Sequence, residues 1–498
     1  MTKKKMFKNI LSGFGGQFIA IVLGLVVPRL FITSYGSDVN GLLSTIAQIF
    51  TYLALLESGI GQAARNLLYK PFQEKDKEQI IEVSSIAKAY FRRCTLIYGL
   101  GVIVLSILLP AVLKTQINNR TVTLIVLLEG MSGVISFWFI QVPTIILGVD
   151  GRNYVNNNIS LINKIVSCVV KIVMASLKCN ILLLEVAYFS ITLTKVLFYK
   201  LYFKNNYQWL YYKRTNNRIK LKDRNSYIIT EICWTVFSST DMIILSTFVS
   251  TQLSSVYGIY NMIFSNISIL LNAVYTSIVY LLGQTFHEDK AKYAIIHDMF
   301  NSVFIGLITS LMIVCYFLTI PFVELYTRGV NDISYVYTYL PIMFCLVQLM
   351  SWSRYISGNL IGLAGRIRKA VWVNVLEALI NLSFSIIGVL KFGIVGVLFA
   401  TVIALPVKLI YCNYVGDKII LGRSCKNTVK ILGINFTLFF LAVFICHFVT
   451  LSVGAYTEFV LYGLGLLGIT LTIVMFINAV ANPYLMNYAF GRLRKDGR

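Results

Sequence analysis

One stretch of this chain limits its possible folds more than any other feature. Residues 96–113 read LIYGLGVIVLSILLPAVL and carry no charged side chain. A helix of about 20 residues, rising about 1.5 Å per residue, crosses the hydrocarbon core of a bilayer. Similar runs recur from end to end, and only 13% of the 498 residues are charged, against about 25% in a soluble domain. The sequence therefore predicts an all-α polytopic membrane protein.

We expect about fourteen transmembrane helices, since backbone polar groups cannot face lipid unless they are hydrogen-bonded within the helix. The predicted spans are residues 10–34, 41–63, 94–113, 122–148, 157–177, 181–201, 227–249, 256–285, 295–320, 336–361, 371–390, 393–413, 431–452 and 457–480. The basic start, Lys3 to Lys5, leads directly into the first span, so we expect no cleavable signal peptide.

The net charge of +23 could suggest nucleic acid as a partner, but its distribution argues against this. Lysine and arginine gather in the N-terminal tail, the even-numbered loops and the C-terminal tail. The odd-numbered loops hold only Lys114, Arg120, Lys178, Arg328 and Lys391. By the positive-inside rule, both termini are therefore predicted to be cytoplasmic. The basic linker from Lys200 to Arg224 is expected on the anionic inner leaflet.

The chain shows weak internal repetition. GVDGR (Gly148 to Arg152) follows the fourth predicted span, and GLAGR (Gly362 to Arg366) follows the tenth. We predict two parallel six-helix repeats around a central cavity, related by an axis along the membrane normal. The predicted parts are an N-terminal half (residues 1–199), a basic cytoplasmic linker (200–226), a C-terminal half (227–413), and two extra helices with a basic tail (414–498).

Ionisable side chains inside a span cost about 2.5–3.5 kcal/mol each, so they usually face a cavity or a partner. The cations within the predicted spans are Arg29, Lys164, Lys171, Lys195, Arg354 and Lys408. The acids that we single out there are Glu57, Glu129, Glu185, Glu231, Asp241 and Glu377. We expect Glu57, two turns inside its span, to have a partner or to face a wet cavity.

Polar side chains also follow one face of the span over residues 256–285. They are Asn261, Ser265, Ser268, Asn272 and Thr276, spaced as on one side of a helix. Hydrogen bonds between helices would explain any one of them. The repetition of polar faces in several spans instead favours a water-filled cavity between the two halves.

Fixed cations in such a cavity suit an anionic substrate, because Arg and Lys form charge-assisted hydrogen bonds with phosphate. The predicted substrate-binding residues are Arg29, Lys164, Lys171, Lys195, Arg354, Lys408, Asn261, Ser265 and Asn272. The predicted coupling or gating residues are Glu57, Asp241, Glu231 and Glu377. Snorkelling to the headgroups is the alternative for Lys164, Lys195 and Lys408, and an exit gate is the alternative for Arg29.

The sequence favours neither a metal site nor an organic cofactor. The nine cysteines are scattered, and His287, His297 and His447 are isolated in the sequence. No phosphate-binding loop of the G-x-x-x-x-G-K-[ST] type occurs. We expect no catalytic residues, and H⁺ or Na⁺ as the coupling ion.

Three segments carry a resemblance to a known family. They are PRLFITSYGSDVNGLLSTIAQIF (Pro28 to Phe50), LLESGIGQAARNLLYKPFQEKDKEQI (Leu55 to Ile80) and TDMIILSTFVSTQLSSVYGIYNMI (Thr240 to Ile263). In these segments the chain resembles the polysaccharide-repeat flippases of the multidrug/oligosaccharidyl-lipid/polysaccharide exporter superfamily. Ser58 replaces the leucine that is usual in the family, and Met242 replaces the usual asparagine. The motif match carries over Arg29, Glu57 and Asp241.

The resemblance implies a multi-pass carrier in the bacterial cytoplasmic membrane. Its substrate would be an oligosaccharide linked to undecaprenyl pyrophosphate, which crosses to the outer leaflet while its tail stays in the membrane lipid. The product would be an O-antigen of lipopolysaccharide, a capsule or an exopolysaccharide, with a polysaccharide polymerase as partner.

Two other readings remain. A cation-coupled multidrug exporter of the same superfamily would also have charged side chains within its spans, and six cations balance six acids here. A membrane glycosyltransferase or polymerase would also handle polyprenyl-linked sugars, but these enzymes generally need larger outside loops. We therefore expect a transporter and not an enzyme.

Overall fold

The computed structural model describes residues 3–57, 60–213, 224–448, 453–482 and 485. Within these residues the secondary structure is helical, as the sequence predicts, and no strand occurs. The chain forms two compact units, Met1–Ser255 (the N-terminal unit) and Val256–Arg498 (the C-terminal unit). We describe each by itself.

Long apolar runs account for most of the helices. Nine helical stretches of the described residues are long and apolar enough to cross a membrane, so the chain is a multi-pass membrane protein. Side-chain caps set several starts. Asp76 accepts a hydrogen bond from the backbone N–H of Gln79, and Asp289 accepts two, from Ala291 and Lys292. These caps satisfy N–H groups that a helix start leaves without an intrahelical partner.

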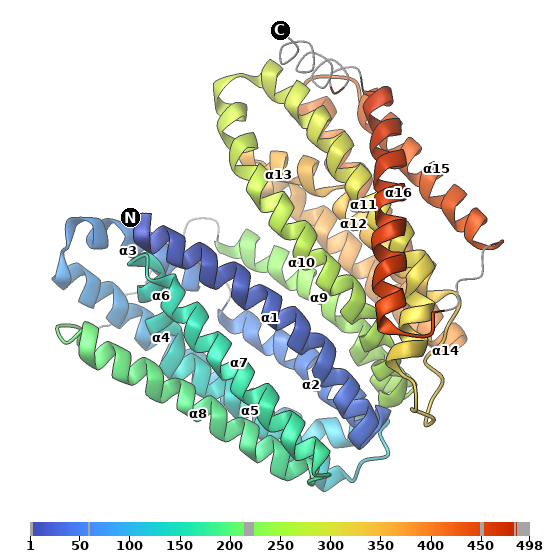
Figure 1. The fold of residues 1–498 in the computed structure, drawn as a ribbon. Coiled ribbons are helices and arrows are strands. Elements are labelled where there is room, and N and C mark those ends of the chain that lie inside the picture. Colours follow the sequence, from blue (N-terminus) through green and yellow to red (C-terminus); the bar gives the residue numbers. More distant parts are fainter. Residues whose placement is uncertain (1–2, 58–59, 214–223, 449–452, 483–484, 486–498) are drawn as a thin grey trace. The chain divides into compact units, whose positions relative to one another are not determined.

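The N-terminal unit is built from the blue to green elements of Figure 1. In order they are α1 (Lys3–Tyr35), α2 (Ser37–Ala54), the short helix η1 (Leu55–Glu57), α3 (Ile60–Glu74), α4 (Lys77–Val112), α5 (Asn119–Ile135), the wider turn η2 (Ser136–Ile140), α6 (Gln141–Val149), α7 (Asn153–Ser176), α8 (Ile181–Asn206), α9 (Arg224–Phe248) and the start of α10 (Thr251–Glu288). α1 packs on α2 and α7, and α8 packs on α5 and α7.

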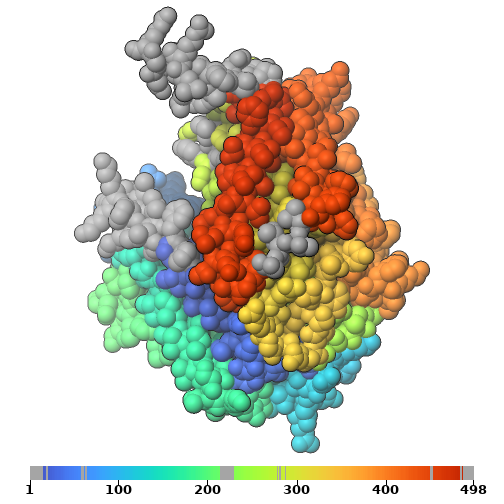
Figure 2. Space-filling view, turned by 45° about the vertical axis from the view of Figure 1, so that its right-hand side comes forward, coloured from blue at the N-terminus to red at the C-terminus, as the bar shows by residue number. Residues whose placement is uncertain are grey.

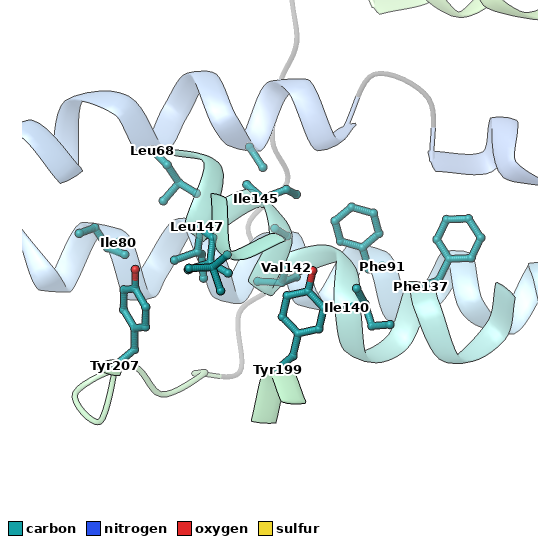
Figure 3. Packing of buried hydrophobic residues seen from close by; sticks show 14 of the residues in the cluster. Leu68, Ile80, Phe91, Phe137, Ile140, Val142, Ile145, Leu147, Tyr199 and Tyr207 are labelled. Carbon is teal, nitrogen blue, oxygen red and sulfur yellow. The ribbon is translucent and has the colours of Figure 1, made fainter. Parts of the chain in front are cut away.

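A core of apolar side chains lies among α3, α4, α6 and α8 in this unit. Figure 3 shows Phe91, Ile140 and Val142 facing Tyr199 there. Phe91 is 1% exposed and Tyr199 is 2% exposed. This cluster fixes the end of α8 against the segment from η2 to α6.

The C-terminal unit continues α10. It then contains α11 (Lys290–Tyr326), α12 (Leu340–Trp352), α13 (Tyr355–Leu363), α14 (Ile367–Tyr414), the wide turn η3 (Val415–Ile420), α15 (Lys426–Cys446) and α16 (Tyr456–Ala481). The two predicted extra helices are α15 and α16, and both pack against α11. The basic tail from residue 486 onward lies outside the described residues.

Some predicted spans are divided in the structure, and two are joined in one helix. The predicted span over 41–63 is divided into α2, η1 and α3. The spans predicted over 371–390 and 393–413 form the two legs of α14, which meet at Gly393 with φ of +56°. Only glycine adopts such a φ readily, so Gly393 permits the reversal. The predicted linker (200–226) is shorter in the structure, because α8 continues to Asn206 and α9 begins at Arg224; residues 214–223 lie outside the described ones.

The two repeated sequence motifs fold into the same turn. Gly151 and Gly365 both have positive φ, of 70° and 66°. In each turn the glycine N–H donates to the carbonyl three residues earlier, and the following arginine N–H donates to the carbonyl five residues earlier. These are the bonds of a glycine-terminated helix end. The likeness supports the internal repeat locally, and the division into two six-helix repeats remains a prediction.

The outer surface of α16 suits contact with lipid. Figure 2 shows this helix, in red, along one face of the molecule. Leu461 and Phe476 on α16 are 70% and 68% exposed. Large exposed apolar surfaces of this kind are rare on soluble monomers.

A buried amide pair joins α15 to α16. Asn435 and Asn478 donate to each other's side-chain oxygens over 2.8 and 3.1 Å.

We expect Asn435→Ala to lower the free energy of unfolding by about 1 kcal/mol, since hydrogen bonds between membrane helices contribute about that much. Thermal unfolding in detergent would measure it. The control is Thr472→Ala, at an exposed position on α16. Asn427, at the start of α15, is unsuitable as a control because its side chain contacts Asp298. Equal melting of the two variants would contradict the expectation.

Candidate functional site

Three of the predicted site residues meet inside the C-terminal unit. Arg354 lies between α12 and α13, and Glu377 and Lys408 lie on the two legs of α14. The Arg354 guanidinium donates to Oε1 of Glu377. Nζ of Lys408 lies 3.7 Å from Oε2 of the same carboxylate. We call these three residues the cation pair site.

Within the cation pair site, two positive side chains contact one carboxylate. Arg354 and Glu377 are each 3% exposed, while the Lys408 side chain is 24% exposed. Burying ions is costly, so each charge needs the others. Two cations share the one carboxylate of Glu377, so Glu377 balances the positive charge of Lys408 only in part. An anion that reaches Lys408 would therefore be attracted to it. The roles predicted for these residues remain predictions.

The polar face of α10 is only partly paired within the C-terminal unit. Ser268 donates to Gln348 on α12 over 2.7 Å, and the indole of Trp352 donates to both. Ser265 donates to Asn261 over 3.4 Å. Ser265 and Asn272 are exposed. A hydrogen bond between helices therefore accounts for the polar side chain of Ser268. Ser265 and Asn272 instead place polar side chains on the exposed surface of α10.

Lys171 has compensating groups within the N-terminal unit. Its Nζ lies 4.3 Å from the ring centroid of Tyr188 and 5.4 Å from that of Phe31. Lys171 also interacts electrostatically with Glu129 and Glu185. The two acids and the lysine thus form one charged cluster among α5, α7 and α8, which the sequence alone did not reveal.

Lys164 and Lys195 are neighbours on α7 and α8 and interact as like charges. Lys164 is exposed, and Lys195 is partly exposed. Their repulsion favours a place where solvent or an anion reaches them. Snorkelling, the alternative drawn from the sequence, also agrees with this exposure.

Glu57 has a partner, as the sequence required. Nε2 of Gln141 on α6 donates to Oε2 of Glu57 over 2.7 Å. Arg65 on α3 adds a favourable charge interaction. The break at η1 turns Glu57 toward α6, so this carboxylate links three elements of the N-terminal unit.

The predicted outer ends of α2, α9 and α10 are joined by a polar seal. Asp38 accepts hydrogen bonds from the hydroxyls of Thr115 and Thr251, and from the N–H of Gln116. Asn40 donates to Ser255 over 2.8 Å, and the hydroxyls of Thr45 and Ser246 are 2.5 Å apart. We call Asp38, Asn40, Thr45 and their partners the outer seal.

Gly41 allows α2 and the start of α10 to approach each other closely in the outer seal. A Cβ at this position would lie 1.7 Å from the carbonyl oxygen of Thr251. No side chain fits there, so α2 and the start of α10 approach by their backbones. Asp241, a predicted gating residue, is 4% exposed on α9 and interacts with Tyr52. The Tyr52 hydroxyl in turn hydrogen-bonds Thr240.

The remaining predicted residues lie apart from these clusters. Arg29 is partly exposed on α1, and Glu231 is exposed on α9. The structure therefore gives no geometric reason to group Glu231 with the gating residues.

Sequence reasoning missed a second charged cluster in the C-terminal unit. Arg423 donates to Asp298 and Asp417 over 2.5 and 2.8 Å, and His297 lies 3.1 Å from the same guanidinium. Burial opposes the charge on Arg423, but the hydrogen bond with Asp298 and the charges of both acids outweigh it and raise its pKa. The interpretation of His297 as isolated is therefore wrong. The cluster joins His297 and Asp298 to Asp417 and Arg423, more than a hundred positions away. Its one signal in the sequence is Asp298, an acid inside the predicted span over residues 295–320.

Neither a metal nor a cofactor is suggested by this geometry. Among the described residues, no three His, Cys, Asp or Glu side chains lie together as ligands of an ion would. Arginine and lysine occupy the places beside the buried carboxylates of the C-terminal unit instead.

Comparison of the fold with solved structures gives a consistent result. The structure of the lipid II flippase MurJ in an inward closed conformation matches with a TM-score of 0.66, covering 93% of this chain and 98% of that one at 16% identity. The chain has the fold of these transporters. An inward-facing multidrug resistance MATE transporter of the MOP superfamily matches with a TM-score of 0.59 at 13% identity, covering 79% and 93%.

A third structure, a complex of the MATE multidrug transporter DinF-BH, matches with a TM-score of 0.58 at 15% identity, covering 85% of this chain and 97% of that one. No protein-family model matches the sequence, and no curated protein matches it in sequence. The comparisons therefore agree on the fold that MurJ and these MATE transporters share, while the likeness to polysaccharide-repeat flippases rests on the sequence motifs alone.

Proposed function

We propose that this chain is a flippase for an oligosaccharide linked to undecaprenyl pyrophosphate. It would move the lipid-linked repeat unit from the inner to the outer leaflet of the bacterial cytoplasmic membrane, with both of its own termini in the cytoplasm. The product would enter the assembly of an O-antigen, a capsule or an exopolysaccharide, where a polysaccharide polymerase is the expected partner.

The observation that carries this proposal is the extent of the match to MurJ. It covers 93% of this chain, while the matches to MATE transporters described above cover 79% and 85%. MurJ is named a lipid II flippase, and a lipid-linked substrate for this chain agrees with the sequence motifs. The shared fold supports a common transport principle without identifying the sugar.

The charges agree with an anionic substrate. The cation pair site carries one cation in excess, and its Lys408 is partly exposed. Lys164 and Lys195 form a second cationic pair in the N-terminal unit. A pyrophosphate would offset either excess through charge-assisted hydrogen bonds.

Alternating access gives the outer seal a role in this proposal. Asp38, Lys114 and Thr251 fall in the predicted outside loops, where Nζ of Lys114 also donates to the carbonyl of Phe248 over 2.6 Å. With this seal closed, substrate would enter from the cytoplasmic side. Protonation of an acid such as Glu57 or Glu377, or Na⁺ binding to it, would supply the coupling as the halves move.

A cation-coupled multidrug exporter is the second candidate, because two of the matching structures are multidrug transporters. The two candidates differ in the charge of the substrate. Removing a cation from the binding site should weaken transport of a pyrophosphate and should not weaken transport of a cationic drug.

We therefore expect Lys408→Gln to reduce transport of a pyrophosphate-linked sugar at least about tenfold, since a hydrogen bond to a charged group contributes about 1.5 kcal/mol or more. The Arg354–Glu377 pair remains in this variant, so the protein should still fold. Lys391→Gln, at an exposed position on the same helix α14, is the matched control. Undiminished export by Lys408→Gln in cells would count against the assignment of Lys408.

Deletion of the gene in the native host tests the function as a whole. The proposal predicts loss of a surface polysaccharide and accumulation of lipid-linked repeat units on the cytoplasmic side. The multidrug alternative predicts an intact surface polysaccharide and increased sensitivity to cationic compounds.

A further inference from the structure

A pocket in the N-terminal unit shares no residue with the outer seal or the Lys171 cluster. It has a volume of about 570 Å³ and lies between the first half of α4, the segment from η2 to α6, and the end of α8. Residues 207–212, which follow α8, complete its wall. This volume is within the range of pockets that hold small ligands.

Four cations line the pocket: Lys88, Arg92, Lys200 and Lys204. Lys200 and Lys204 are four residues apart and therefore lie on one face of α8. No acid occurs among the described residues that line the pocket. Asp150, which lies nearby, is already bound to Arg152 over 2.8 Å and to the hydroxyl of Tyr207 over 2.6 Å.

Aromatic rings, not carboxylates, hold two of the cations in place. Nζ of Lys88 lies 3.5 Å from the ring centroid of Tyr212, and the Arg92 guanidinium lies 5.2 Å from that of Trp138. Such contacts orient a cation without neutralising its charge. Burial raises the pKa of Tyr212 to about 12, so this ring adds no negative charge near neutral pH. Among the described residues that line it, the pocket therefore presents positive charge with no carboxylate to balance it.

One wall of the pocket is largely apolar and well packed. Figure 3 shows Tyr199 and Tyr207 extending toward the segment that carries Ile140 and Val142. Tyr199 is 2% exposed, and its hydroxyl donates to Asn156 over 3.2 Å. A ligand of this pocket would thus meet a fixed apolar wall and a cationic rim.

Apolar surface continues from the pocket along both bordering helices. Leu100 and Ile107 on α4 are 66% and 69% exposed, and Leu197 and Leu201 on α8 are 58% and 59% exposed. Such faces suit acyl chains. The positive-inside rule assigns this end of α4 and α8 to the cytoplasmic side, where the leaflet carries anionic lipids.

We propose that this pocket binds the phosphate-bearing headgroup of an anionic membrane phospholipid. The four cations would hold the phosphate, and the acyl chains would lie on the exposed faces of α4 and α8. Basic pockets between membrane helices on the cytoplasmic side bind anionic headgroups by the same chemistry. The site is distinct from the residues proposed to carry the transported substrate, so it does not depend on the proposed function.

Native mass spectrometry of the detergent-purified full chain, after delipidation, tests the proposal. Phosphatidylglycerol and phosphatidylcholine with identical acyl chains are titrated separately. We expect phosphatidylglycerol to bind at least about tenfold more tightly. In Lys200→Gln/Lys204→Gln this preference should disappear, since the loss of two basic residues near a membrane surface corresponds to roughly 30-fold in affinity for an anionic lipid.

The matched control is Lys369→Gln/Lys426→Gln, which removes two exposed charges from the C-terminal unit. It should keep the preference within about twofold of the unmodified protein. All four substituted side chains are exposed, so equal melting temperatures are expected for both double variants. Equal binding of the two phospholipids by the unmodified protein, or an unchanged preference in Lys200→Gln/Lys204→Gln, would overturn the proposal.

A competition with inorganic phosphate separates a lipid from a soluble anion. If the acyl chains contribute as proposed, excess inorganic phosphate leaves phosphatidylglycerol bound. Complete displacement by inorganic phosphate would assign the pocket to a free phosphate and would refute the lipid assignment.

Discussion

Glu377→Gln should lower the free energy of unfolding by about 3–5 kcal/mol, the usual cost of removing one partner from a buried ion pair. The substitution keeps the shape of the side chain, so it leaves no cavity. It removes the carboxylate that Arg354 and Lys408 share, and Arg354 stays 3% exposed. Thermal and denaturant unfolding in detergent would measure the loss.

Two further variants test whether the loss of stability comes from the buried ion pair. Glu324→Gln removes an exposed acid from α11 and should change stability little. Arg354→Met combined with Glu377→Gln should recover much of the loss, because the buried cation is then gone as well. If Glu377→Gln melts together with Glu324→Gln, the buried pair does not stabilise the C-terminal unit.

Gly41→Ala should shift the protein toward a state in which the outer seal is open. The added Cβ would lie 1.7 Å from the carbonyl oxygen of Thr251. Because this oxygen belongs to the backbone, it cannot rotate away as a side chain could, so the two helices must separate. Overpacking of this kind costs about 1–3 kcal/mol, which corresponds to a change of about 5–150-fold in the ratio of closed to open protein.

The opening can be followed at Ser255, which is fully buried in the seal. In a background without native cysteines, Ser255→Cys should react slowly with a membrane-impermeant maleimide, and Gly41→Ala should increase this rate. Gly24→Ala is the matched control, since a Cβ at Gly24 meets no atom within 4 Å. An equal rate in both glycine variants would mean that the seal does not open at Gly41.

The helices could be predicted from the sequence because long apolar runs leave lipid-facing backbone no other structure. The reversal near residue 392 was also foreseen, and Gly393 with its positive φ explains it. The polar seal was not foreseen. Asp38 lies outside the predicted spans, and its partners Thr115 and Thr251 are distant in the sequence.

The candidate sites could be predicted as single residues but not as constellations. An intramembrane charge stands out by its cost, which is why Arg354, Glu377 and Lys408 were identified. Their meeting depends on α14 folding back at Gly393, and no periodicity encodes that distance. Arg423 and Asp298 were missed because Arg423 lies in a predicted loop and Asp298 lies in the first turn of the predicted span over residues 295–320, where charges are common.

Reconstitution into liposomes tests the central claim most directly. A labelled oligosaccharide on polyprenyl pyrophosphate is placed in one leaflet, and its arrival in the other is read with a membrane-impermeant enzyme that removes the label. The account predicts movement that requires this protein and is at least about tenfold slower with Lys408→Gln than with Lys391→Gln. Absence of movement under an H⁺ or Na⁺ gradient, together with protein-dependent efflux of a cationic dye, would contradict it.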